Sequence, residues 1–170
     1  MHDNTLSEDI ASRRTICFPI NRSSNEILLG MKLEGFGKGK YNGFGGKLKT
    51  GETPEQAAKR ELSEESGLDV SISDLEKIAI IDFIFPFKPE YNQLVHVYFA
   101  SKYSGSPKKT DEMNPKWFSM NNIPYRKMWD SDRLWLRLLI EGGKIYGKFF
   151  WKEDNETVDH YEIQFLDAFK

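Results

Sequence analysis

The segment from Thr53 to Gly67 constrains the fold of this chain more than any other, because its sequence specifies both ends of a helix. Thr53 is a favourable N-cap, and Gln56 follows three residues later to complete a capping box. Pro54 stands at the first helical position, where its missing N–H costs nothing. Gly67 stands where a left-handed C-cap residue belongs. The pattern predicts a helix over residues 54–66.

The polar face of this helix carries three glutamates, Glu61, Glu64 and Glu65, at positions i, i+3 and i+4. Like charges at this spacing destabilise a helix by about 0.2–0.5 kcal/mol per pair, and near its C-terminal end they also oppose the helix dipole. Arg60 precedes Glu64 by four residues and can hold one carboxylate in place. A divalent cation that prefers oxygen ligands would relieve both penalties. The alternative is a solvated acidic face with ion pairs.

The wider spacing favours the metal site. Glu52 follows Gly46 after five residues, Arg60-Glu61-Leu62 follows after seven more, and Glu64-Glu65 and Gly67-Leu68 complete the pattern over 23 residues. Every specified position of the Nudix box is met, so the chain resembles the Nudix hydrolases. A kinase-like phosphate loop is excluded, because Gly46 and Gly51 are followed by Glu52 and Thr53 rather than by Lys and Ser or Thr.

The resemblance implies that the box forms a loop–helix–loop and that its helix binds Mg²⁺ or Mn²⁺ for phosphoanhydride hydrolysis. Glu52 would support the ligands, by a metal or water contact or by orienting Arg60, and Glu64 or Glu65 would act as the base. The metal ligands it implies are Gly46, Glu61, Glu64, Glu65 and, from a separate loop, Glu112.

The sequence outside the box narrows the resemblance to one branch of the family, the oxidised purine nucleoside triphosphatases of the MutT homologue type. The resemblance extends from about residue 15 to residue 165, and the motifs that carry it are Gly30-Met31-Lys32, Gly35-Phe36-Gly37, Tyr41-Asn42-Gly43-Phe44, Asp111-Glu112-Met113, Trp117-Phe118, Ile123-Pro124 and Met128-Trp129-Asp130-Ser131-Asp132. It implies release of a nucleoside monophosphate and pyrophosphate, with 8-oxo-dGTP as a typical substrate.

By position, this branch implies a purine pocket in which Trp129 stacks on the base while Asn42 and Asp132 read its polar edge. Such a pocket makes chemical sense, because a purine needs an aromatic platform and a few fixed polar groups. Lys32 is placed to meet the phosphates. The complete set of predicted substrate-binding residues is Thr15, Lys32, Phe36, Asn42, Phe83, Phe85, Met113, Trp129 and Asp132.

Two positions depart from this branch. Its members carry two adjacent acids after the tryptophan and one intervening residue, whereas this chain has Ser131-Asp132 there. Asp130 follows the tryptophan directly and is expected to point elsewhere. Gln93 replaces a pocket methionine near an insertion at residues 87–91. We therefore predict a preference for purine triphosphates with unequal handling of guanine and adenine lesions.

The remaining sequence predicts an α/β fold of the Nudix type, an α/β/α sandwich on a mixed curved β-sheet. Six glycines within residues 35–46 indicate tight turns or close backbone approach. Residues 1–14 are predicted to be a flexible tail and residues 15–170 one Nudix domain. The predicted strands are 15–20, 26–33, 76–85, 93–101, 116–120, 145–151 and 157–165, and a second helix is predicted at 132–141.

Bulk composition sets the expected surroundings. The net charge of −2 gives no general attraction to nucleic acid polymers or anionic membranes. The single cysteine, Cys17, excludes an internal disulfide, and no apolar run approaches a membrane span. These features predict a cytoplasmic enzyme that acts as a monomer on a nucleoside triphosphate. A different Nudix substrate, such as ADP-ribose or a dinucleoside polyphosphate, stays open. A non-catalytic nucleotide-binding module is the third alternative, which the intact box argues against.

Overall fold

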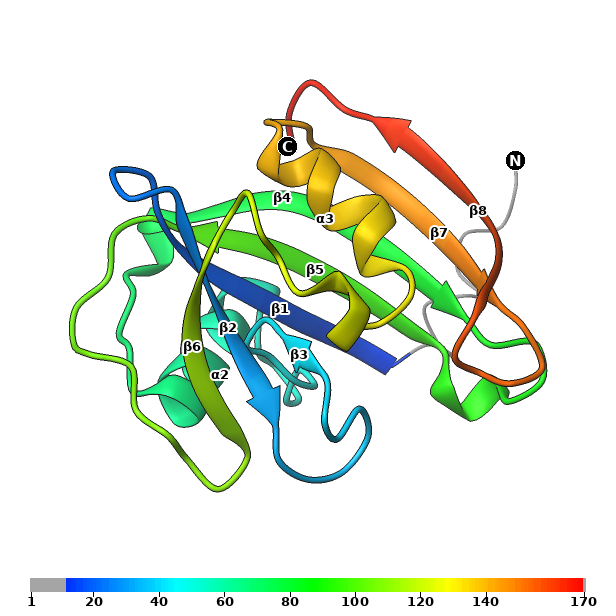
Figure 1. The fold of residues 1–170 in the computed structure, drawn as a ribbon, viewed down its shortest axis with the longest axis horizontal. Coiled ribbons are helices and arrows are strands. Elements are labelled where there is room, and N and C mark those ends of the chain that lie inside the picture. Colours follow the sequence, from blue (N-terminus) through cyan, green and yellow to red (C-terminus); the bar gives the residue numbers. More distant parts are fainter. Residues whose placement is uncertain (1–11, 170) are drawn as a thin grey trace.

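The computed structural model describes residues 12–169, and in it a single curved β-sheet lies between two α-helices (Figure 1). The strand order is β3-β2-β1-β5-β4-β7-β8, and β6 pairs with β2. The parallel pairs are β1 with β5 and β4 with β7, whereas the other pairs are antiparallel. The predicted mixed sheet is therefore confirmed.

The elements follow one another in a strand-rich order with one helix in each half of the chain. The strands are β1 (Ser12–Asn21), β2 (Glu26–Lys32), β3 (Tyr41–Asn42), β4 (Leu75–Ile84), β5 (Gln93–Ala100), β6 (Met113–Ser119), β7 (Ile145–Trp151) and β8 (Val158–Phe165). The α-helices are α2 (Pro54–Ser66) and α3 (Asp132–Ile140), and the short 3₁₀ turns are η1 (Ile72–Asp74), η2 (Pro89–Tyr91) and η3 (Tyr125–Lys127).

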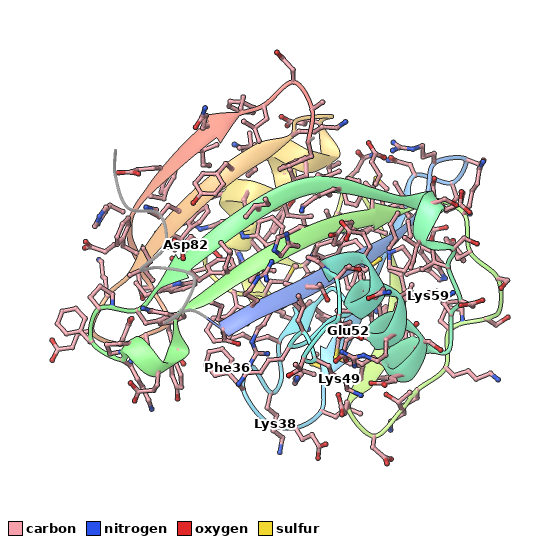
Figure 2. The ribbon with its side chains drawn as sticks, turned by 180° about the vertical axis from the view of Figure 1, so that it is seen from behind. Phe36, Lys38, Lys49, Glu52, Lys59 and Asp82 are labelled. Atoms are coloured by element: carbon pink, nitrogen blue, oxygen red, sulfur yellow. The ribbon has the colours of Figure 1, made fainter. Side chains whose placement is uncertain are left out.

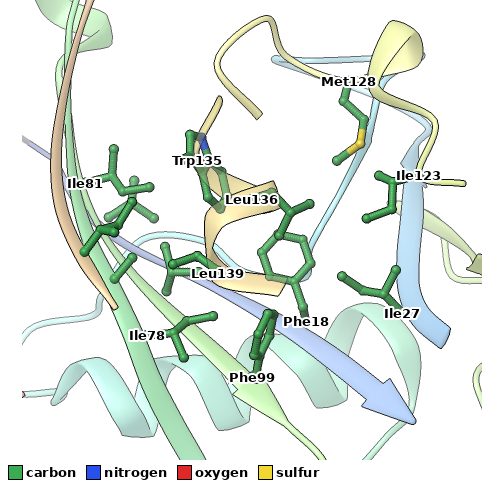
Figure 3. Packing of buried hydrophobic residues seen from close by; sticks show 14 of the residues in the cluster. Phe18, Ile27, Ile78, Ile81, Phe99, Ile123, Met128, Trp135, Leu136 and Leu139 are labelled. Atoms are coloured by element: carbon green, nitrogen blue, oxygen red, sulfur yellow. The ribbon is translucent and has the colours of Figure 1, made fainter. Parts of the chain in front are cut away.

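Alternation along the strands divides the core into two layers. Cys17 packs with Ala58 and Leu62 of α2 on one face of the sheet, whereas its neighbour Phe18 packs with α3 on the other. Figure 3 shows Trp135, Leu136 and Leu139 of α3 among the apolar side chains of that second layer. The two helices cover opposite faces, which confirms the predicted sandwich.

The predicted ends of α2 are confirmed. The Gln56 N–H donates to Thr53 Oγ1 at 3.1 Å, and the Thr53 N–H donates to Gln56 Oε1 at 2.9 Å. Gly67 has φ 78°, the left-handed conformation that favours glycine. The small side chains of Ala57 and Ala58 are fully buried, so the helix lies close to the sheet.

Two strands begin well before their predicted starts, whereas the other strand boundaries in the prediction differ by at most one residue. β1 begins at Ser12, so residues 12–14 belong to the sheet rather than to a tail. Their side chains are polar, and their pairing with residues 93–95 of β5 connects segments far apart in the sequence, which local patterning does not reveal. The rest of the predicted tail lies outside the described residues. β6 begins at Met113, before its predicted start at 116, because residues up to Met113 pair with β2. Within residues 12–169, no helix is long and apolar enough to cross a membrane.

Candidate active site

The glycines at the start of the box are required by close backbone approach. Residues 44–48 run beside β1, where the Thr15 N–H donates to the Gly46 carbonyl at 3.0 Å and the Leu48 N–H donates to the Arg13 carbonyl at 3.1 Å. A Cβ at Gly45 would lie 1.7 Å from the Thr15 carbonyl oxygen, and one at Gly46 would lie 2.6 Å from Glu61 Oε1. The loop can therefore press against the β1 backbone only with glycine at position 45, whereas a side chain at position 46 would displace the Glu61 carboxylate.

Arg60 organises the carboxylates of the box. Its Nε and Nη2 donate to the two carboxylate oxygens of Glu52 at 2.7 and 2.8 Å, which makes a bidentate pair. Figure 2 shows Glu52 beside α2. Its Nη1 donates to Glu61 at 2.8 Å and to Glu64 at 3.4 Å. The hydrogen bonds from Arg60 lower the pKa of Glu52 to about 2. The expectation that Arg60 fixes a carboxylate is confirmed, and Glu52 is the carboxylate that Arg60 binds through both oxygens.

Glu65 is the buried acid of the cluster, with 3% of its surface exposed. Its Oε1 accepts from the Gly45 N–H at 3.2 Å. Burial and the nearby charge of Glu61 raise the pKa of Glu65 to about 8, Glu112 adds to the rise, and Lys32 opposes it. Residues from the loop, α2, β2 and the segment before β6 thus interact electrostatically at one place.

Arg60 connects the carboxylates of Glu52, Glu61 and Glu64 by hydrogen bonds, whereas Glu65 bonds to the glycine loop instead. In the part of the chain from residue 12 to residue 169, no group of three His, Cys, Asp or Glu side chains has the arrangement of a metal site. The assignment of Gly46, Glu61, Glu64, Glu65 and Glu112 as metal ligands therefore stays a prediction.

A cavity opens beside Glu65 and continues into a second, more apolar pocket. The first, here called the catalytic cavity, is lined by Arg14, Thr15, Ile16, Lys32, Phe36, Gly37, Lys40, Asn42, Gly43, Gly45, Gly46, Glu65, Gln93, Val95, Met113 and Trp129. The second, here called the base pocket, is lined by Ile16, Phe36, Asn42, Phe83, Phe85, Gln93, Val95, Trp129, Ser131, Asp132, Trp135 and Trp151. Asn42 and Trp129 are among the residues that line both cavities, and the two form one continuous space.

The structure gathers every predicted substrate-binding residue into this continuous space. Thr15, Lys32 and Met113 line the catalytic cavity, Phe83, Phe85 and Asp132 line the base pocket, and Phe36, Asn42 and Trp129 line both. Neither cavity is lined by Glu61, Glu64, Arg60, Glu52 or Glu112. The placement is thus as expected, whereas the contacts these residues make with a substrate stay predicted.

Asp132 forms the polar end of the base pocket. It is 2% exposed, and burial raises its pKa to about 8. Ser131 Oγ lies 3.5 Å from Asp132 Oδ1 and accepts from Trp135 Nε1 at 3.3 Å, whereas Asp132 Oδ2 has no partner among the described residues. Asp130 points elsewhere, as predicted, because its Oδ2 accepts from the Val158 N–H at 2.9 Å.

Five aromatic side chains form a closed ring beside the base pocket, and all of them except Tyr91 line it. Ring centroids are separated by 4.9 Å for Phe36–Trp129, 4.7 Å for Phe36–Tyr91, 5.7 Å for Tyr91–Phe85, 5.3 Å for Phe85–Trp151 and 5.7 Å for Trp151–Trp129. Sequence reasoning missed Tyr91 and Trp151. Tyr91 lies in the insertion, and Trp151 ends an alternating strand in the same way as a core residue would. Arg14, placed in the tail from sequence, was missed as a cavity residue.

A mixed sheet between two helices, with a capped acidic helix against a glycine loop and a cavity beside its buried carboxylate, defines a Nudix hydrolase. The Nudix domain matches residues 11–139, and the chain belongs to the Nudix family. It is 47% identical over 134 residues to the oxidized purine nucleoside triphosphate hydrolase of Danio rerio, covering 79% of this chain and 84% of the relative. It is 43% identical over 143 residues to the protein of that name from Mus musculus, covering 84% and 89%.

The fold is shared with more distant proteins. A MutT protein from Bacillus halodurans superposes with a TM-score of 0.77 at 22% identity, covering 89% of this chain and 97% of that one. At this identity the likeness shows the fold alone.

Proposed function

We propose that this protein hydrolyses oxidised purine nucleoside triphosphates, such as 8-oxo-dGTP, to the monophosphate and pyrophosphate, and so cleanses the nucleotide pool. The observation that carries the proposal is the continuity of the base pocket with the catalytic cavity beside Glu65. A purine held against Trp129 would direct its phosphates toward the carboxylates of α2. The names of the zebrafish and mouse relatives support this choice of substrate.

The donor set fits a hard divalent cation, Mg²⁺ or Mn²⁺. Glu61, Glu64 and Glu65 of α2 offer carboxylate oxygens, and Gly46, in the loop that lies against Glu61, offers a backbone carbonyl oxygen. When bound, the cation would neutralise phosphate charge and activate a water for attack. Arg60 would release Glu61 and Glu64 so that their carboxylates could bind the cation. Its bidentate pair with Glu52 would keep Arg60 in place. Glu112, on the segment before β6, would complete the set.

Within the base pocket, hydrogen-bonding capacity is directed inward. Asn42 Oδ1 accepts from the Gly43 N–H at 2.8 Å, which leaves the side-chain amide N–H groups to donate to the base. The raised pKa of Asp132 keeps its carboxyl protonated near neutral pH, so the carboxyl O–H can donate a hydrogen bond to the base. An ionised carboxylate can only accept hydrogen bonds. Ser131 supplies only a hydroxyl. One protonated acid instead of two supports unequal handling of guanine and adenine lesions.

Lys32 is the residue we assign to the phosphate chain. It is half-buried, lines the catalytic cavity, and its charge acts on Glu65. A lysine at this place can contact a phosphate while it limits the repulsion between the substrate and the carboxylates of α2. Thr15 and Met113 would shape the wall of the catalytic cavity.

The proposed substrate is tested by a panel of normal and oxidised nucleotides with Mg²⁺ or Mn²⁺, scored by release of pyrophosphate. We expect kcat/KM to be largest for an oxidised purine triphosphate. If ADP-ribose or a dinucleoside polyphosphate is hydrolysed more efficiently than every triphosphate, the mapping of the base pocket is wrong.

We also propose that the protein acts as a monomer in the cytoplasm on free nucleotides rather than on nucleic acid polymers or membranes. The net charge of −2 supports this, because it gives no general attraction to polyanionic surfaces. Sedimentation of the pure protein, with and without a DNA oligonucleotide, would test both the oligomeric state and the absence of polymer binding.

A further inference from the structure

Arg14 places a guanidinium in the wall of the catalytic cavity. It pairs in register with Val95 of β5, and Val95 and Ile16, the next residue along β1 on the same face, also line that cavity. Its neighbour Arg13 is exposed and acts electrostatically on His96 and Lys77 instead. The two consecutive arginines therefore serve different faces of the sheet.

The Arg14 side chain has no protein partner to explain its position. Its Nε is buried without a hydrogen bond among the described residues, and no ion pair formed within residues 12–169 includes it. Arg60, by contrast, meets three carboxylates. Burial lowers the pKa of Arg14, and the nearby Glu61 opposes that shift. A half-buried cation without a partner is costly unless a ligand supplies the anion.

Its surroundings indicate which anion. The backbone of Arg14 bridges to Lys47, the residue after Gly46, and Gly46 lies against the Glu61 carboxylate of α2. The charge of Glu61 also acts on the Arg14 guanidinium. Arg14 and Lys47 also line a further hollow that adjoins the catalytic cavity, whereas neither lines the base pocket. Arg14 thus lies outside the base pocket, in the wall of the catalytic cavity. A ligand whose base fills the pocket at Asp132 would extend its phosphates into the cavity that Arg14 lines.

We propose that Arg14 binds the outer phosphates of the substrate, those that leave as pyrophosphate, and thereby selects triphosphates over shorter nucleotides. This rests on the proposed function, because it assumes that the base occupies the pocket at Asp132. The guanidinium is planar and carries five N–H donors, which suits bidentate contact with a phosphate. Its fixed charge also offsets repulsion between the outer phosphates and Glu61.

The test compares Arg14→Ala and Arg14→Lys with Arg13→Ala, a matched loss of an arginine on the other face of β1. Hydrogen bonds to charged groups predict that Arg14→Ala lowers kcat/KM for 8-oxo-dGTP by about tenfold to a hundredfold. The loss should be smaller for 8-oxo-dGDP, and binding of 8-oxo-dGMP should not change. Arg14→Lys should recover part of the loss, and Arg13→Ala should resemble wild type.

Calorimetric binding of inorganic tripolyphosphate, which requires no turnover, separates this proposal from the proposed function. Weaker tripolyphosphate binding by Arg14→Ala and Arg14→Lys than by wild type would support the role of Arg14 even if the enzyme preferred another nucleoside. Equal losses for the mono-, di- and triphosphate, or tripolyphosphate binding that does not change in Arg14→Lys, would overturn it. The lysine variant keeps the charge and so gives a readout if Arg14→Ala does not fold.

Discussion

The acidic face of α2 and the base pocket are assembled in contrasting ways. The box residues lie within one stretch of 23 residues, and Arg60 connects Glu52, Glu61 and Glu64 by hydrogen bonds. The aromatic ring beside the base pocket instead takes side chains from five separate segments between Phe36 and Trp151. The first region is local and charged, whereas the second is non-local and mostly apolar.

Because of this difference, we expect the acidic face to control kcat and the base pocket to control KM. Charges near the reacting phosphates act on the transition state, so their loss should lower kcat. Aromatic contacts to the base are made equally in the ground state and the transition state, so their loss should raise KM. A variant of the acidic face that changed only KM, or a variant of the base pocket that changed only kcat, would contradict this division.

The largest effect is expected for Glu61→Gln. This change keeps the shape of the side chain but removes a carboxylate beside Gly46, and we expect kcat to fall by about a thousandfold, as for loss of one strong electrostatic contact to a transition state. Steady-state release of pyrophosphate measures it. Glu55→Gln is the matched control on the same helix, because Glu55 accepts from the Tyr98 hydroxyl at 2.8 Å and lines neither pocket. A kcat for Glu61→Gln close to that of Glu55→Gln would remove Glu61 from the chemistry.

Trp129→Ala should produce the next largest effect, this time on KM. Stacking of a base on an aromatic side chain contributes about 1–3 kcal/mol, so KM for an oxidised purine triphosphate should rise by about tenfold to a hundredfold. At saturating substrate, kcat should stay within a few-fold of wild type. Trp117→Ala serves as the control, since Trp117 packs on Tyr103 at 6.2 Å and lines neither pocket. An unchanged KM in Trp129→Ala would show that the base binds elsewhere.

The contrast also explains what the sequence alone could predict. Both ends of α2 were correct to the residue, because Thr53, Pro54, Gln56 and Gly67 encode them within one short segment. The positions of Asn42, Trp129 and Asp132 in one pocket followed from resemblance to a family rather than from local pattern.

What was missed depends on pairing between distant segments. Arg14 looked like part of a polar tail because nothing nearby in the sequence shows that β1 pairs with β5. Tyr91 and Trp151 both contact Phe85, and they do so only because the fold brings the turn after β4 and the end of β7 together. The sequence leaves two alternatives for Glu52, a metal or water contact or the orientation of Arg60. The structure shows its contact with Arg60, which depends on how the loop closes against α2.

Asp132 should make the stability of the protein depend on pH. Its pKa is raised to about 8 by burial, whereas in the unfolded chain it titrates near 3.9. Between these values the folded state binds more protons than the unfolded state, so the free energy of unfolding falls as the pH rises. The contribution of this one group is at most about 1.4 kcal/mol per pH unit.

Asp132→Asn removes this titration and is the comparison to make. Urea unfolding of both proteins from pH 5 to pH 8 should show a smaller decrease in stability with pH for the asparagine variant. Parallel pH profiles for the two proteins would mean that Asp132 is ionised in the folded state, and its assignment as a hydrogen-bond donor to the base would then be wrong.

The smallest expected effect is that of Tyr91→Ala, and it tests whether the aromatic ring acts as one unit. Tyr91 touches Phe36 and Phe85, and Phe36, which is 43% exposed, also packs on Trp129. Loss of an aromatic pair costs about 0.5–1.5 kcal/mol, so Phe36 should become less well positioned and KM should rise by about twofold to tenfold. Tyr91→Phe keeps the ring and should retain the wild-type KM.

The distribution of the Tyr91→Ala effect between kcat and KM decides what the ring does. A rise in KM alone would mean that Tyr91 belongs with Trp129 to the platform for the base. This would hold although Tyr91 lines the hollow that adjoins the catalytic cavity rather than the base pocket. A fall in kcat that matches the fall in kcat/KM would instead mean that the ring helps to align the phosphates with α2. In that case the aromatic and acidic regions are coupled through Phe36, and the division between binding and chemistry does not hold for this enzyme.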